Sequence, residues 1–280
     1  MGKFDKDSLG DRMKGYEAVY KQILVPKLPI VIRVDGKAFH TFTKGMAKPF
    51  DDLLMDTMQR TMLALCKDLQ TCKLGYTQSD EITLVCVCDD VIKTEGLYKY
   101  KVNKILSIIA SKATRYFNKF FSENIRNLEQ YPNTFTNAVD IEVYRSKEFG
   151  AEFDCRVMNI PEYDVINNLI WRQQDATRNS IQMLGQANFS HKELQGKNCS
   201  EIQDMLIARK GINWNNLAVD KKRGSCCYRV KDDEEETRTP WVVDKDMPIL
   251  TEAAARERFT KIMFGNIVNN PLMVDLNSEN

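Results

Sequence analysis

The stretch Gly75-Tyr76-Thr77-Gln78-Ser79-Asp80-Glu81 decides the fold class of this chain. It lies between two short apolar runs, and its central residues are typical of a tight turn, so it predicts a β-hairpin. A second motif, Arg33-Val34-Asp35-Gly36-Lys37-Ala38-Phe39-His40, begins within a β-branched run over 30–34. Each motif places an acidic residue where a buried strand meets a turn. Two carboxylates on neighbouring strands are able to hold a pair of divalent ions.

Composition places the chain among ordinary soluble globular proteins. It has 280 residues, of which 43% are hydrophobic and 28% are charged, and this suits one large domain or two small ones. The net charge of +1 creates no global field, so a surface for nucleic acid must come from local clustering. The first residues lack the apolar core of a signal peptide, and no apolar run reaches membrane-spanning length. We therefore expect a cytoplasmic protein with no membrane partner.

Cysteine and histidine usage argues against a structural zinc site. The eight cysteines include no C-x-x-C pair, and the two histidines are His40 and His191. Reduced thiols in a cytosolic protein are the simpler interpretation.

The first 160 residues predict an α+β arrangement. Helices are expected over 8–25, from Pro49 to about 69, and over 97–122. Strands are expected over 30–34, on both sides of the 78–81 turn with the second over 82–88, and over 153–160. The strand over 82–88 is almost wholly apolar, which predicts that both of its faces are covered. The β-α-β-β-α-β order is that of ferredoxin-like and polymerase-palm folds, so we predict a palm-like antiparallel sheet with helices.

The remaining residues form a second predicted region. Residues 161–185 and 198–209 are helical in pattern, Lys221-Lys222-Arg223-Gly224 reads as a basic turn, and 231–236 is an acidic run expected to form an exposed loop. We therefore predict a palm-like catalytic domain over 1–160. A mainly helical region with a hairpin over 161–280 would complete the site and the oligomer.

The helix predicted over 97–122 is amphipathic and contains basic but no acidic residues. Its expected apolar stripe consists of Val102, Ile105, Ile109, Ala113, Tyr116 and Phe120. Its basic residues are Lys99, Lys101, Lys104, Lys112, Arg115 and Lys119. A charged helix face is ordinarily just solvated, but solvated faces normally mix both signs. Charge of one sign therefore favours a surface that contacts phosphate.

Asp35 and Asp80 are the candidate metal ligands. In a palm, the end of the first strand and the hairpin between the next two meet at one edge, so these carboxylates would stand side by side. Mg²⁺ prefers one or two carboxylates together with waters and phosphate oxygens. Gly36 would let a main-chain carbonyl approach the metal. Asp-Gly and Ser-Asp taken singly are simple turn dipeptides, but their pairing at strand ends is more specific.

Several motifs together resemble the tRNA-His guanylyltransferase family. They are Arg33-Val34-Asp35-Gly36, Phe39-His40, Phe42, Ala47-Lys48-Pro49, Gly75 to Glu81, Phe153-Asp154-x-Arg156, Trp171-Arg172-Gln173-x-Asp175, Leu194-Gln195-Gly196 and Asn213-x-Asn215-Asn216. The resemblance covers roughly residues 10–245. It implies a palm-like catalytic domain, a homotetramer, two Mg²⁺ ions, and addition of nucleotides to the 5′ end of tRNA, with ATP and GTP or another nucleoside triphosphate as substrates. That direction is the reverse of ordinary polymerases.

The same resemblance implies roles for individual residues. Asp35, the Gly36 carbonyl and Asp80 would bind the metals, with both aspartates catalytic, while Glu81 and Asn179 are possible further contacts. The expected nucleotide-binding residues are Arg33, Lys37, Ala38, Phe39, His40, Lys48, Ser79, Lys101 and Lys104. The expected tRNA-binding residues are Lys112, Arg115 and Lys119. For His40, a packed or turn-stabilising role is an equally good interpretation.

One departure from the family pattern bears on the substrate. Members specific for tRNA-His carry a His-Ile-Asn-Asn segment after the Trp-Arg-Gln-x-Asp motif. Here Thr177-Arg178-Asn179-Ser180 stands in its place, so only the first Asn is kept. The chain is more similar to the guanylyltransferase-like branch, whose members resemble a tRNA 5′-end repair polymerase. We therefore predict template-directed repair of 5′-truncated tRNAs after activation of the 5′ end by ATP.

Three alternatives stay open from the sequence: a tRNA-His-specific guanylyltransferase, a catalytically inactive RNA-binding palm protein, and a nucleotide cyclase. An RNA-recognition module would carry aromatic residues on its central strands, and the run 82–88 has none. A cyclase also uses two aspartates at similar places, but the downstream Trp171-Arg172-Gln173 motif disfavours it.

Overall fold

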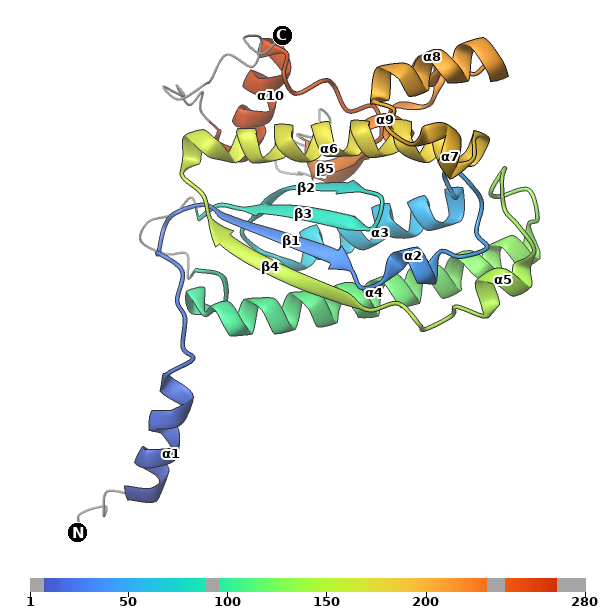
Figure 1. The fold of residues 1–280 in the computed structure, drawn as a ribbon. Helices are drawn as coiled ribbons and strands as arrows, with labels where there is room; N and C mark the ends of the chain where they lie inside the picture. The colour runs from blue at the N-terminus through green and yellow to red at the C-terminus, as the bar shows by residue number, and fades with distance from the viewer. Residues whose placement is uncertain (1–7, 89–95, 231–239, 266–280) are drawn as a thin grey trace, which may run out of the picture.

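The computed structural model describes residues 8–88, 96–230 and 240–265, so the acidic run over 231–236 lies outside the described residues. A single antiparallel sheet organises the chain (Figure 1), with strand order β4-β1-β3-β2-β5-β6. The strands are β1 (Ile30–Gly36), β2 (Cys72–Gln78), β3 (Glu81–Cys86), β4 (Phe153–Asn159), β5 (Ser225–Arg229) and β6 (Trp241–Asp244). The predicted α+β palm-like class is confirmed, and β1 lies between β4 and β3.

Helices cover both faces of this sheet. The longer ones are α1 (Ser8–Ala18), α3 (Asp52–Asp68), α4 (Val102–Gln130), α6 (Glu162–Asn188), α8 (Cys199–Lys210) and α10 (Ala253–Phe264). The short ones are α2 (Phe39–Phe42), α5 (Ile141–Arg145), α7 (His191–Leu194), α9 (Val219–Arg223) and the 3-10 turns η1 (Leu97–Tyr100) and η2 (Trp214–Asn216). None of the helices in the described ranges is long and apolar enough to cross a membrane.

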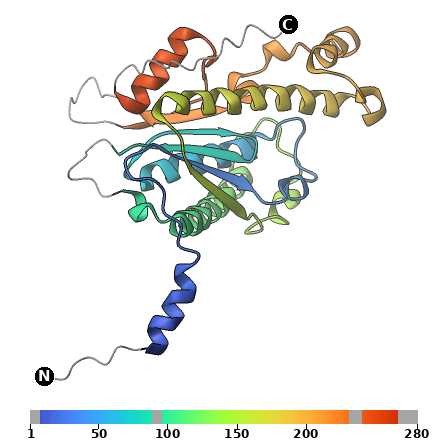
Figure 2. The same cartoon turned by 60° about the vertical axis from the view of Figure 1, so that its left-hand side comes forward.

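Side chains alternate between the two faces along each strand, so the sheet contributes to two separate hydrophobic cores. Ile30, Ile32 and Val34 of β1 point to the face covered by α3 and α4, where they join the larger hydrophobic cluster. Val31 points to the opposite face and joins the cluster formed by α6 and α10. All six residues of β3 are buried, so the prediction that both faces of this strand are covered is confirmed. Figures 1 and 2 show α6 running along one face of the sheet and α4 along the other.

The structure corrects two predicted helices. The first helix ends at Ala18 rather than at residue 25, and it projects away from the body of the molecule in both views (Figures 1 and 2). The helix expected over 97–122 is divided into η1 and α4, and α4 continues to Gln130. The left-handed backbone of Tyr98 and Lys99, with φ of 45° and 57°, separates the two.

The apolar stripe of α4 also differs from the prediction beyond Ala113. The fully buried rings are Phe117 and Phe121, one position later than the predicted Tyr116 and Phe120. Aromatic side chains explain the difference, because Phe39, Phe42 and Phe153 pack against Phe117. Tyr116 instead turns outward, where its hydroxyl bonds to the Asp68 carboxylate.

The C-terminal region contributes to the same sheet as the first 160 residues. The run over 225–229 pairs with β2, and Trp241–Asp244 then pairs with β5. The sheet therefore continues across the predicted boundary at residue 160. The predicted basic turn over 221–224 is the end of α9, closed by Gly224 with φ of 80°.

Gly75 lies where the sheet packs against α3, so a substitution at this position tests that packing. A Cβ at this position would lie 2.5 Å from Cys66 Sγ and 2.9 Å from Met62 Cγ, and both side chains are fully buried. Gly75→Ala should lower the free energy of unfolding by about 1–3 kcal/mol, because a well-packed core resists added volume. Urea denaturation measures it. Gly15→Ala in the exposed helix α1, where a Cβ meets nothing within 4 Å, is the control and should not destabilise. An equal loss in both variants would contradict this account.

Candidate active site

The end of β1 and the turn between β2 and β3 meet at one edge of the sheet. β1 and β3 are antiparallel, with Asp35 directly opposite Glu81. Just beyond this pair, the Gly36 amide donates a hydrogen bond of 3.1 Å to the Asp80 carbonyl oxygen. The predicted adjacency of the two strand ends that carry Asp35 and Asp80 is therefore confirmed.

The segment after Asp35 folds back over the strand end. A Cβ on Gly36 would lie 2.3 Å from the Phe39 ring, so no larger residue fits there. Ala38 adopts left-handed backbone with φ of 53° and starts α2. The Phe39 ring is buried in the core, so the structure does not offer this ring to a nucleotide. His40 is exposed on α2 and does not pack into the core.

Lys37 lies on the same turn but is turned towards β4. Its ammonium group forms an exposed ion pair of 2.6 Å with the Glu152 carboxylate. That partner raises the pKa of Lys37, and Lys37 in turn lowers the pKa of Glu152. The lysine therefore remains a cation at the entrance to the strand end.

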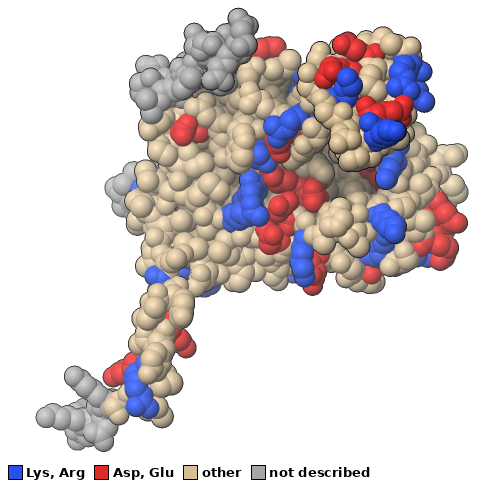
Figure 3. All heavy atoms as spheres, in the orientation of Figure 1, with Lys and Arg blue, Asp and Glu red and all other residues tan. Residues whose placement is uncertain are grey.

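The two carboxylates at the strand ends repel one another. Burial, followed by the Asp35 charge, raises the pKa of Asp80. Arg156 on β4 places a cation at this edge, with its guanidinium 4.0 Å from the Asp35 carboxylate. β4 also places Asp154 opposite Asp35 in register, which adds an exposed acid to this edge. Acidic side chains gather over the end of β1 in Figure 3, with basic side chains beside them.

This arrangement fits a divalent ion of the hard, oxygen-binding type. Among the described residues, no group of three or more His, Cys, Asp or Glu side chains is arranged to hold a metal. Two converging carboxylates and a main-chain carbonyl nonetheless match Mg²⁺, which takes its other ligands from waters and phosphates. A bound cation would also relieve the repulsion that raises the pKa of Asp80. Asp35, Asp80 and the Gly36 carbonyl are the residues that would hold it.

A cavity of about 220 Å³ lies at the β2–β3 turn, where Ser79, the residue before Asp80, forms part of its wall. Its walls come from the loop before α3, the β2–β3 turn, α6 and α9. Three predicted contact residues line it together: Lys48, Ser79 and Asn179. Most of the wall is apolar, including Met46, Pro49, Met55, Ala176 and Met183. A planar, weakly polar group of nucleobase size fits such a cavity.

Asp51 holds the loop that carries Lys48, and the sequence analysis did not single it out for this role. Its buried carboxylate accepts hydrogen bonds from the amides of Ala47 and Leu54 and from the Tyr144 hydroxyl. The bond to Leu54 caps the N-terminus of α3, while the bond to Ala47 closes the loop. An Asp before a helix predicts a cap, but the contact with Tyr144 becomes visible only in the fold.

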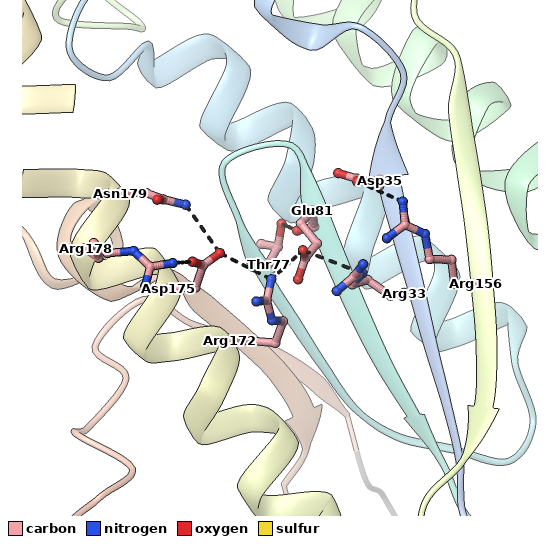
Figure 4. A network of polar contacts seen from close by, with 9 residues as sticks. All are labelled: Arg33, Asp35, Thr77, Glu81, Arg156, Arg172, Asp175, Arg178 and Asn179. Carbon is pink, nitrogen blue, oxygen red and sulfur yellow. Dashed lines mark hydrogen bonds and ion pairs between the residues drawn. The ribbon is translucent and has the colours of Figure 1, made fainter. Parts of the chain in front are cut away.

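The Glu81 carboxylate is held by two arginines. Its Oε2 atom lies 2.9 Å from the Arg172 guanidinium and 3.8 Å from Arg33 (Figure 4). Burial raises the pKa of Glu81, and the two arginines oppose that effect. Arg33 is thus placed against Glu81 and the Trp171 ring rather than being left open for phosphate alone.

Lys101 and Lys104 lie at the other end of the sheet. Residues 22–24 bond to the backbone around Tyr100, and η1 and the start of α4 lie beside the end where β1 begins (Figure 1). β1 has seven residues at ~3.3 Å each, so roughly 20 Å separates its two ends. The structure therefore does not bring these lysines to Asp35 within one chain. They line a separate cavity with Asp68 and Gln70.

The outer part of α4 is less one-sided in charge than the sequence suggests. Lys112 forms an ion pair of 2.9 Å with Asp68 of α3, and Lys119 lies 3.8 Å from Glu123. Arg115 stays exposed and packs over the Tyr116 ring. Acids from a neighbouring helix and from the next turn supply the missing negative charge.

Direct metal binding tests the carboxylate pair. Asp35→Asn and Asp80→Asn should each weaken binding of Mn²⁺, an oxygen-binding ion used as a spectroscopic probe, by at least about tenfold, since each removes one anionic ligand. Electron paramagnetic resonance of free Mn²⁺ measures this. Glu152→Gln, which changes an exposed acid paired with Lys37, should leave the affinity unchanged. Unchanged affinity in either aspartate variant would remove that residue from the metal site.

Comparisons with known proteins agree with this geometry. The family described as tRNAHis guanylyltransferase matches residues 10–161. A probable tRNA(His) guanylyltransferase of Dictyostelium discoideum is 30% identical over 238 residues, which cover 77% of this chain and 81% of its own length. A bacterial tRNA(His) guanylyltransferase-like protein in complex with ATP has a TM-score of 0.77 and 39% identity, and the match covers 92% of this chain and 100% of that one. The corresponding structure in complex with GTP has a TM-score of 0.72 and 36% identity, with the same coverage. This chain therefore belongs to the tRNAHis guanylyltransferase family and is a palm-like nucleotidyltransferase.

Proposed function

We propose that this enzyme adds nucleotides to the 5′ end of tRNA in the 3′-to-5′ direction, and that it repairs 5′-truncated tRNAs by copying the opposite strand of the acceptor stem. One observation carries the proposal: in a member of this family, the turn that carries Asp80 meets the end of β1 that carries Asp35, and Ser79 of the same turn lines a nucleobase-sized cavity. Similar solved proteins hold ATP and GTP, which supports nucleoside triphosphates as substrates.

The reaction has two phosphoryl transfers. The 5′-monophosphate of the tRNA first attacks the α-phosphorus of ATP, which forms an adenylylated end and releases pyrophosphate. The 3′-hydroxyl of an incoming nucleotide then attacks the activated 5′-phosphorus, a new phosphodiester forms, and AMP leaves. Asp35, Asp80 and the Gly36 carbonyl would hold Mg²⁺, which when bound would supply positive charge that favours an ionised hydroxyl and an anionic leaving group.

The chain's own residues position these groups. Lys48 and Ser79 lie on the wall of the cavity, where an ammonium and a hydroxyl can reach phosphates of the bound nucleotide. Arg156 stands at the Asp35 carboxylate and is exposed, so it is able to neutralise a phosphate that enters there. The backbone around Ala38 and His40 borders the same strand end.

The segment that replaces the family's His-Ile-Asn-Asn offers few groups that would select one base. Within this segment, Arg178 pairs with Asp175, and the Ser180 hydroxyl bonds to the Thr177 and Lys222 carbonyls. Asn179 is the one amide of this segment on the cavity wall. A mostly apolar wall accepts any base, so selectivity falls to pairing with a template.

Contacts with tRNA extend beyond the cavity in this proposal. Arg115 and Lys119 remain exposed on α4 and would contact the RNA backbone electrostatically. Lys112 already forms an ion pair with Asp68, so it would contribute less to RNA binding.

We also propose a homotetramer, and the exposed apolar side chains of α1 support association with a partner. This helix has 11 residues, buries none of them, and projects from the body with Leu9, Met13 and Tyr16 exposed at helical spacing. So short a helix is marginal alone in water, which favours a covering partner.

Light scattering should show a smaller assembly for the chain lacking residues 1–18. An unchanged mass would exclude α1 from the interface.

Nucleotide incorporation tests the function. Several tRNA transcripts that lack their first nucleotide are each offered all four nucleoside triphosphates, with every template base at the opposing position. We expect the complementary nucleotide to be added at least about 100-fold faster than the others, because a mismatch leaves base donors and acceptors unpaired. Asp80→Asn, which removes a proposed metal ligand, is the inactive control. Addition of guanosine only, and to tRNA-His only, would contradict templated repair and identify a tRNA-His-specific enzyme.

A further inference from the structure

A chain of buried ionic contacts connects the β2–β3 hairpin with helix α6. The Glu81 carboxylate pairs with Arg172 at 2.9 Å, and the same guanidinium nitrogen lies 3.3 Å from Asp175. The Glu81 and Arg172 side chains are only 9% and 7% exposed. Asp175 also pairs with Arg178 and accepts a hydrogen bond of 3.4 Å from the Asn179 amide. Figure 4 shows these groups in one line from the strand to the helix.

The two ends of this chain of contacts belong to different parts of the site. Glu81 directly follows Asp80, the proposed metal ligand, and stands opposite Asp35. Asn179 lines the cavity proposed for the base. The metal-binding turn and the cavity wall are thus joined through two side chains, Arg172 and Asp175.

The contacts also determine how Asn179 is presented. The Asp175 carboxylate lies between two arginines and accepts a hydrogen bond from the Asn179 side chain, so the NH₂ group of that amide faces it. The Asn179 carbonyl oxygen is then directed away from Asp175. If Asp175 or Arg172 moves, the amide is free to turn over.

Stability alone does not account for such an arrangement. A buried ion pair is weak evidence for stability, because hydrophobic residues of similar volume often replace it without loss. Glu81 Oε1 and Arg172 Nε are buried without a hydrogen-bond partner among the described residues, so the pair is not optimised for energy. The guanidinium of Arg172 contacts a carboxylate on the strand and a second carboxylate one turn further along its own helix. This geometry is suited to holding the strand and the helix in register.

We propose that Glu81, Arg172 and Asp175 are positioning residues that couple the metal-binding Ser79–Asp80 turn to Asn179 on the cavity wall. They keep the phosphates and the base of one bound nucleotide aligned for attack. The inference rests on the proposed function, since it assigns the base and the phosphates to these two places. Misplacement of reacting groups by about 1 Å is enough to cost on the order of 100-fold in rate.

The test uses Glu81→Gln, which keeps the shape but removes the charge, and Arg172→Lys, which keeps the charge but removes the planar fork. Asp244→Asn is the matched control, because Asp244 also bridges a strand and a helix, through Tyr228 and Arg258, away from the site. Single-turnover nucleotide addition, the dissociation constant of ATP and the thermal midpoint are measured for each full-length variant.

We expect both site variants to lose roughly 100-fold in the single-turnover rate while the ATP dissociation constant changes less than about threefold. Asp244→Asn should keep the wild-type rate even where its thermal midpoint falls equally. The double variant should lose no more rate than either single variant, because both changes break the same link. A rate that falls only in proportion to the midpoint, in all three variants, would overturn the proposal.

Hydrogen exchange with ATP alone provides a readout that needs no tRNA chemistry. In the wild type, ATP should protect amides of both 77–82 and 176–180. In Arg172→Lys, protection should persist in 77–82, next to the proposed phosphate site, and be lost in 176–180. Equal protection of both segments in Arg172→Lys, or of neither in the wild type, would overturn the coupling. If the wild type shows coupled protection but adds no nucleotide to truncated tRNA, the proposed function fails while the positioning role stands.

Discussion

The antiparallel pairing of β1 with β3 is the constraint on which the rest of the structure depends. It places Asp35 opposite Glu81 and brings the Gly36 amide to the Asp80 carbonyl. Because side chains alternate along a strand, a slip of one residue would turn Asp35 to the face of α3 and α4. The same slip would turn Ile32 and Val34, which are now completely buried, to the opposite face of the sheet and out of the larger core. Burial of the core therefore fixes the register that the carboxylates need.

The two faces of the sheet carry different side chains, so one face supports the larger core and the other contributes to the site. The face under α3 and α4 is closed by aliphatic and aromatic side chains, up to the Phe39 ring that seals the end of β1. The face under α6 is apolar at one end and becomes polar towards the strand ends, where Arg33 and Glu81 replace Val31 and Val85. The site lies where the apolar part of this second face ends, so it combines a rigid support with access to solvent.

Charge is concentrated at the site at some cost in stability. Asp80 is held near Asp35 with a raised pKa, and Glu81 is buried between two arginines with one oxygen that has no hydrogen-bond partner in the described part of the chain. Local energetic conflict of this kind is typical of functional sites, where it is offset by packing elsewhere. A bound divalent cation would relieve the first conflict, and the ion pair of Arg172 with Asp175 on α6 holds the arginine that faces Glu81.

The sequence by itself determined the hairpin, the β-α-β-β-α-β order and the meeting of the two carboxylate-bearing strand ends, because turn chemistry and hydrophobic alternation act over a few residues. It predicted a hairpin in the C-terminal region but did not show that its strands extend the same sheet beside β2, and it did not reveal the two-part start of α4 or the shift of the apolar stripe to Phe117. Only the tertiary structure placed Lys101 far from Asp35 and joined Glu81 to Arg172, since those two residues stand 91 positions apart in the chain. Such contacts depend on how a helix docks on a sheet, and no local pattern encodes the angle and depth of that docking.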